Sequence, residues 1–196
     1  MFGHKDLLGR LNEKLAITEK VDYLYKITNE RFPFISRIAV AMYDADCDLI
    51  KTFAHSTDTG NPLPHYQTKL SEARSLNNIV KEGKPRIVND LSIFDKSDHK
   101  HAQQIKSHGF QASYTVPLYN DLEFLGFAFF NSREKNVFGS DNLGYLDMIA
   151  RLLSLLIGRR ISEVKTLHGA LKTATEFTGH RDPETGAHLD RMAHFV

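Results

Sequence analysis

The chain has 196 residues with 41% apolar content, a formal charge of +1 at pH 7 and a single cysteine, Cys47. The length fits one full domain plus a shorter segment, and the near-zero charge gives no electrostatic reason to expect nucleic acid or acidic membrane as a partner. One cysteine excludes an intrachain disulfide, and no apolar run reaches the roughly 18 residues of a membrane span, so the sequence predicts a cytoplasmic protein without a membrane helix.

The first third of the chain predicts a helix followed by a β-hairpin. Residues 5–30 place apolar side chains at helical spacing, and Pro33 ends this helix because the residue before a proline is pushed out of the α region. Residues 35–43 and 49–55 are rich in β-forming residues and are joined by the acidic stretch DADCD. This stretch lacks the glycine and glutamate of a calcium loop, so we interpret it as a hairpin turn.

The middle of the chain predicts one further helix at residues 75–81. It also predicts three further strands, at residues 85–89, 110–119 and 122–131. Gly83 is in the position expected just after a helix, and Asn120-Asp121 forms a two-residue turn between the last two strands. The polar segment 95–108 is expected to lie as a loose helix over the sheet. This order of elements predicts an α+β fold with a central antiparallel sheet flanked by helices.

A long helix is predicted over residues 142–178, with Ser140 or Asp141 as its N-cap. Its apolar positions alternate by four and three, as in a coiled coil, along a seam that Arg160 interrupts: Leu146, Ala150, Leu153, Ile157, Val164, Leu167, Leu171, Ala174 and Thr178. The first half is also apolar on other faces, so it should pack on a domain as well. The seam predicts a parallel homodimer formed through helices.

Several stretches resemble the GAF family of sensory domains: ISRIAVAMYDADCDLIKTFAH, SLNNIVKEGKPRIVNDL, SYTVPLYNDLEFLGFAFFNS and VFGSDNLGYLDMIARLLSLLI. The resemblance implies an N-terminal helix over residues 1–33 and a sensor domain over 34–158, whose last helix starts near residue 141. It also implies a cavity for a small-molecule ligand, enclosed by strands 35–43 and 114–119 and the segment around 95–108.

The segment ALKTATEFTGHRDPETGAHLDRMAHFV closely resembles the opening of the HD-GYP family, bacterial phosphodiesterases that hydrolyse cyclic di-GMP. The shared pattern is RDxETGxHxxR. Glu184 and His188 are four residues apart, so on a helix they project from one face, and their oxygen and nitrogen suit iron, manganese or zinc. In the family these two positions supply metal ligands, the glutamate in those members that hold a third metal ion.

The two resemblances together imply a signalling protein. Residues 159–178 are then a connector helix, and residues 179–196 begin an incomplete all-α HD-type domain. The full-length protein is expected to be a metal-dependent cyclic di-GMP phosphodiesterase, whereas this chain alone should be inactive because two ligands do not complete the site. Two alternatives stay open: a stand-alone GAF module for ligand binding or dimerisation, and a regulator of another HD-type metal phosphohydrolase.

Overall fold

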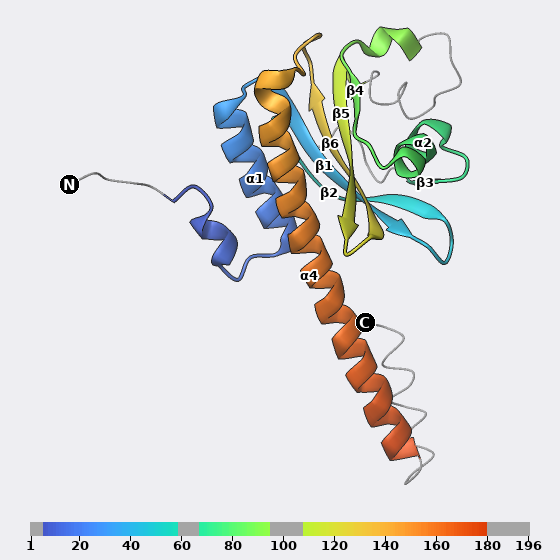
Figure 1. Cartoon of the computed structure of the whole chain (residues 1–196). Helices are drawn as coiled ribbons and strands as arrows, with labels where there is room; N and C mark the ends of the chain where they lie inside the picture. The colour runs from blue at the N-terminus through green and yellow to red at the C-terminus, as the bar shows by residue number, and fades with distance from the viewer. Residues whose placement is uncertain (1–5, 59–66, 95–107, 180–196) are drawn as a thin grey trace, which may run out of the picture. The chain divides into compact units, whose positions relative to one another are not determined.

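The computed structural model describes residues 6–58, 67–94 and 108–179. Within these ranges six strands form one antiparallel sheet in the order β3-β2-β1-β6-β5-β4 (Figure 1). The strands are β1 (Ile35–Asp44), β2 (Leu49–Thr57), β3 (Gln67–Lys69), β4 (Arg86–Val88), β5 (Ala112–Asn120) and β6 (Glu123–Ser132). The helices are α1 (Ile17–Arg31), α2 (Arg74–Glu82) and α4 (Ser140–Gly179), with 3-10 turns at Gly9–Asn12 and Leu91–Phe94. The predicted α+β class and central antiparallel sheet are confirmed.

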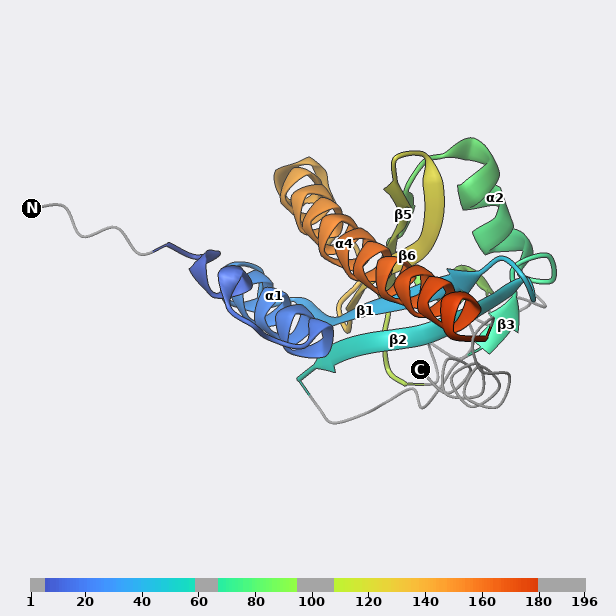
Figure 2. The same ribbon diagram turned by 90° about the horizontal axis from the view of Figure 1, so that it is seen from below.

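Helices cover both faces of the sheet. On one face, the hydroxyl of Ser56 donates a hydrogen bond to Asp22 of α1, and the hydroxyl of Tyr114 donates to Asp147 in the first part of α4. Figures 1 and 2 show α1 and this part of α4 beside each other against the sheet. The opposite face, which we call the α2-side face, packs against α2 through Leu76, Ile79 and their neighbours on the central strands.

Three short segments differ from prediction: the start of α1, the last hairpin turn and the strand β3. The N-terminal helix begins at Ile17, where the backbone N–H of Ala16 donates to the carboxylate of Glu19 at 2.7 Å and caps the first turn. The turn between β5 and β6 lies one residue later than expected, with positive φ at Asp121 and Leu122. The strand β3 was not predicted, because three residues carry too little periodicity to be recognised.

The helix α4 begins at Ser140, which is one residue earlier than a cap at Ser140 allows and two residues earlier than a cap at Asp141 allows. The side-chain oxygen of Asn142 accepts a hydrogen bond from the N–H of Gly139, and its amide donates to the carbonyl of Val137 at 2.8 Å. Gly139 therefore occupies the cap position. Within the described ranges no helix is both long and apolar enough to cross a membrane.

The predicted seam along α4 is only partly available to a second helix. Its early members are buried in the folded chain: Leu146, Ala150, Leu153 and Ile157. The later members Val164, Leu167 and Leu171 are 45%, 55% and 37% exposed. The early seam up to Leu153 therefore belongs to the core of the folded domain, so Leu153 is not available to a second chain, and the dimer itself stays a prediction.

Candidate functional site

Three polar side chains form a buried row on the α2-side face of the sheet. Arg37 of β1, Asn131 of β6 and Ser113 of β5 lie side by side in the strand register, and each is at most 3% exposed. The Nη1 of Arg37 donates a hydrogen bond to Oδ1 of Asn131, and Nδ2 of Asn131 donates to Oγ of Ser113, both at 3.0 Å. We call these three residues the polar row. It combines strands far apart in sequence, so it exists only because of the strand order.

The guanidinium of Arg37 is a buried charge. Within the described residues its buried Nε has no hydrogen-bond partner, and no carboxylate there pairs with the guanidinium. Burial lowers the pKa of Arg37 to about 10, because removal from water disfavours the charged form. The side chain is still protonated at neutral pH, and a buried charge left unpaired destabilises the fold.

A second arginine lies one row further along the same face. Arg86 of β4 pairs with Thr115 of β5, which pairs with Phe129 of β6. The Nε of Arg86 is also buried without a partner among the described residues, and burial lowers the pKa of this guanidinium. The two arginines are on strands three positions apart in the sheet order, which places their backbones roughly 14 Å from each other.

Apolar side chains surround the polar row. The cluster beneath α2 consists of Ala39, Ala41, Ile50, Leu70, Leu76, Ile79, Phe127 and Phe129. A smaller cluster after β4 contains Val88, Leu91 and Phe110. Side chains therefore fill much of this face. Of the segment 95–108 that was expected to cover a ligand cavity, all but His108 lies outside the described residues, so that cavity stays a prediction.

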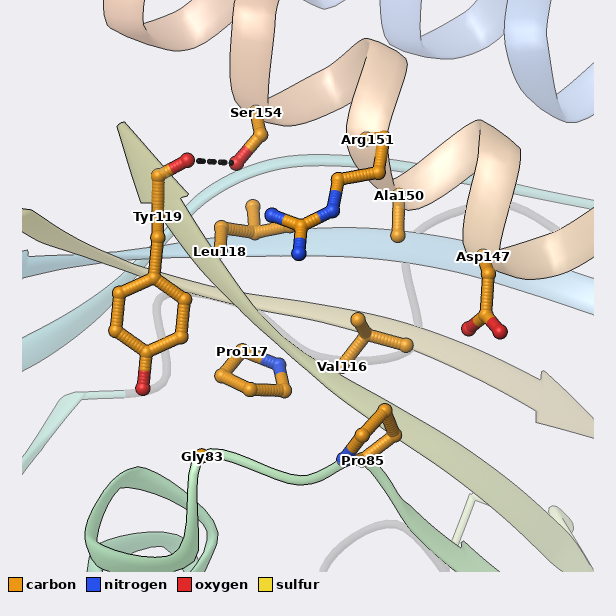
Figure 3. Close-up of a pocket in the computed structure, with 10 residues that line it drawn as sticks. All are labelled: Gly83, Pro85, Val116, Pro117, Leu118, Tyr119, Asp147, Ala150, Arg151 and Ser154. Carbon is orange, nitrogen blue, oxygen red and sulfur yellow. Dashed lines mark hydrogen bonds between the residues drawn. The ribbon is translucent and has the colours of Figure 1, made fainter. Parts of the chain in front are cut away.

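A separate cleft of about 260 Å³ lies between β5 and the first part of α4 (Figure 3). Its lining consists of Gly83, Pro85, Val116, Pro117, Leu118, Tyr119, Asp147, Ala150, Arg151 and Ser154. The pairing of β4 with β5 stops at Thr115, so no described strand pairs with the following part of β5 on that edge, and the cleft opens there. No motif predicted this cleft, because its lining combines ordinary residues from three separate segments.

Two hydrogen bonds join α4 to β5 beside the cleft. The hydroxyl of Ser154 donates to the backbone carbonyl of Tyr119 at 2.8 Å (Figure 3), and the hydroxyl of Tyr114 donates to the carboxylate of Asp147. Burial raises the pKa of Tyr114 well above its ordinary range, and the bond to Asp147 raises it further, because both disfavour the phenolate. These bonds hold the start of the long helix on the sheet.

Replacing Tyr114 with phenylalanine should lower the free energy of unfolding by about 1 kcal/mol at neutral pH, because one part-buried hydrogen bond is lost. Since the folded-state pKa of Tyr114 lies above the unfolded one, its contribution is complete below about pH 10 and declines as the pH rises further. Between about pH 8 and pH 10.5, the free energy of unfolding measured in urea should therefore fall more for the wild type than for the variant. Equal losses would contradict a neutral, hydrogen-bonded Tyr114.

The predicted metal ligands Glu184 and His188 lie outside the described residues. Across residues 6–58, 67–94 and 108–179, no group of three or more His, Cys, Asp or Glu side chains is arranged to hold a metal ion. Cys47 is exposed in the turn between β1 and β2, and a hydrogen bond with Asp44 raises the pKa of its thiol. A thiol with a raised pKa is a poor nucleophile, which agrees with the interpretation of DADCD as a plain hairpin turn.

Comparisons with known proteins agree with this architecture. A family model described as the GAF domain matches residues 30–157. The structure is similar to the GAF domain of an Acinetobacter phosphoenolpyruvate-protein phosphotransferase, with a TM-score of 0.61 and 12% identity over 80% of this chain and 90% of that one. It is also similar to the phycocyanobilin-bound GAF domain of a cyanobacterial phytochrome, with a TM-score of 0.60 and 16% identity over 80% and 92% of the two chains.

A third similar structure is the free methionine-R-sulfoxide reductase of Neisseria meningitidis in complex with its substrate, with a TM-score of 0.58 and 14% identity over 80% of this chain and 93% of that one. Among curated protein sequences, none matches this chain significantly. At these identities the solved structures establish a shared fold. The phytochrome domain is bound to phycocyanobilin and the reductase is in complex with its own substrate, so the fold alone does not select a ligand.

Proposed function

Because the chain belongs to the GAF domain family over residues 30–157, we propose that it binds a small molecule at the polar row and transmits the binding event through α4. The observation that carries this proposal is the buried guanidinium of Arg37, which has no counter-charge and an Nε without a partner among the described residues. A fold selected only for stability gains nothing from such a charge, since an apolar side chain of similar volume is usually as good or better. Strongly perturbed, buried ionisable groups are instead common at binding sites.

The continuous helix α4 supports the second half of the proposal. Its first turns are bound to β5 through Tyr114 and Ser154, and the same helix extends to Gly179. A ligand that changes the packing of the sheet can thereby bias the position of the helix. It acts only to the extent that it binds one arrangement more tightly than the other.

We further propose that the output is a cyclic di-GMP phosphodiesterase domain of the HD-GYP type that begins in residues 179–196. The support is the dense RDxETGxHxxR pattern that follows α4 in the sequence. By the chemistry of their side chains, Glu184 and His188 suit iron, manganese or zinc, but further ligands are needed to fix a coordination geometry. When bound, such metal ions supply an activated water and neutralise phosphate charge.

Native mass spectrometry of protein purified from the producing cells tests the sensor function. The expected spectrum contains a species heavier than the polypeptide by one small molecule. In a protein that carries this chain followed by a complete HD-GYP domain, adding that molecule should change the rate of cyclic di-GMP hydrolysis. A polypeptide without any bound molecule, together with a hydrolysis rate that no cell extract alters, would contradict the proposal.

The exposed apolar stripe of Val164, Leu167 and Leu171 also supports a parallel homodimer. Replacing Leu167 with aspartate should convert the dimer to a monomer, because a charge in the centre of the seam is buried without a partner. Light scattering at tens of micromolar measures the change. Ser162→Asp is the matched control, since Ser162 is exposed on the opposite side of the helix and should leave the dimer intact. A wild-type monomer would remove the dimer from the proposal.

A further inference from the structure

We infer that the molecule bound at the polar row carries an oxyanion, a carboxylate or a phosphate, which pairs with the guanidinium of Arg37. This inference rests on the proposed function, because it names the chemical class of the ligand at the same site. Carboxylates and phosphates match the planar fork of a guanidinium and form the strongest charge-assisted hydrogen bonds with it.

The direction of the hydrogen bonds in the polar row indicates a ligand that accepts hydrogen bonds. Arg37 donates to Asn131, and Asn131 donates to Ser113, so the row uses the amide oxygen and one amide N–H of Asn131. At one end the Nε–H of Arg37 has no acceptor among residues 6–58, 67–94 and 108–179. At the other end the hydroxyl hydrogen of Ser113 is not used in the row, because Ser113 acts there as acceptor. Both ends therefore offer hydrogen-bond donors, and a ligand that completes them must supply acceptors, which a carboxylate or phosphate has in its oxygens.

The charge balance of the described structure selects a negative ligand over a neutral one. Arg37 is the one charged side chain that is buried among the described residues, and no aspartate or glutamate is buried there. Arg86 adds a second, part-buried guanidinium on the same face, again without a partner for its Nε. A neutral ligand would leave both charges uncompensated, whereas one oxyanion neutralises Arg37 directly and interacts favourably with Arg86.

Thermal unfolding of the purified chain in inorganic phosphate and in sodium acetate tests the inference, with sodium chloride at equal ionic strength as the reference. At about 50 mM, at least one of the two anions should raise the wild-type melting temperature by roughly 3 °C, because an anion that binds only the folded state stabilises it by mass action. A response to phosphate alone identifies a phosphate ligand, and a response to acetate alone identifies a carboxylate. If neither anion exceeds chloride, the inference is overturned.

Matched variants locate the effect. Arg37→Met removes the charge at similar length and should abolish the anion-dependent shift. Arg159→Met removes an equal charge from an exposed helix position, where the side chain is 81% exposed, and should retain the shift. Arg37→Lys keeps the charge but loses the fork, so a reduced shift is expected, and this variant still tests the site if the methionine variant folds poorly. An equal shift in Arg37→Met and the wild type would overturn the inference.

Native mass spectrometry of the same variants separates the two levels of the proposal. An acidic molecule present on the wild type and absent from Arg37→Met supports both. A neutral molecule retained equally by both proteins overturns the oxyanion inference while the sensor function stands. A wild-type protein that carries no molecule, and that responds to neither anion, contradicts both.

Discussion

Replacing Gly126 with alanine is expected to lower the free energy of unfolding by about 4 kcal/mol, a large part of the stability of a domain of this size. Gly126 lies in β6 with a φ of 144°, in a region that side-chain-bearing residues rarely adopt. A Cβ placed there would lie 2.0 Å from the backbone carbonyl oxygen of Ala41 on β1. That oxygen belongs to the backbone, so no side-chain rotation relieves the clash. The two central strands would have to separate.

Gly83→Ala is the matched control for this substitution. Gly83 ends α2 with a φ of 64°, also a positive value, but no atom lies within 4 Å of a Cβ built there. Its replacement should cost only about 1 kcal/mol, the ordinary penalty of a left-handed conformation. Urea unfolding of the two variants measures how much stability is lost to the clash between strands and how much to the positive φ alone. Similar small losses for both would show that β1 and β6 tolerate separation opposite Gly126.

Local signals in the sequence predicted most of the strands and helices. The run from Ile35 is rich in β-branched and apolar residues, and β1 begins there as predicted. Gly83 ends α2 where predicted, because a left-handed residue after a helix is a property of a few neighbouring residues. The start of α1 was missed because the apolar spacing of residues 6–16 resembles that of a helix, although Leu7 and Leu8 are exposed. Periodicity shows which residues share one face of a predicted helix. It does not show which part of the protein, if any, packs on that face.

The same limit explains the heptad seam. A stripe of apolar residues four and three apart fits a coiled coil and the core-facing side of a single helix equally well. In the structure Leu146 and Leu153 are buried within the domain, while Leu167 further along the same pattern is exposed. The change of role along one helix depends on which residues pack against each part of it. This is a property of the tertiary structure.

The polar row could not be predicted, because its hydrogen bonds join distant parts of the chain. Arg37 and Asn131 are 94 residues apart, and strand order alone brings them together. One signal was nevertheless present in the sequence. Arg37 stands inside the apolar run ISRIAVAMY, where a strand covered on both faces leaves no route to water. An arginine within such a strand indicates a buried charge and therefore a candidate binding site.

Replacing His188 with alanine is expected to reduce cyclic di-GMP hydrolysis by more than about 100-fold in a protein that carries this chain followed by a complete HD-GYP domain. Loss of residues that merely orient metal ligands already costs about 10- to 100-fold in metal affinity or activity, so loss of a ligand itself should exceed that range. Metal content should fall in parallel, because the imidazole nitrogen is proposed to bind the metal directly. Glu184→Ala should have a smaller effect if its carboxylate serves only one of several metal ions.

His168→Ala provides the matched control for His188→Ala. His168 is exposed on α4, so its removal should leave the metal content, the hydrolysis rate and the fold unchanged. Elemental analysis by plasma mass spectrometry and a cyclic di-GMP hydrolysis assay measure the two expected losses, and circular dichroism checks that the GAF domain is intact in each variant. A His188→Ala protein with the wild-type metal content and rate would show that this histidine is no ligand. The output proposed for the helix α4 would then have to be sought in a different reaction.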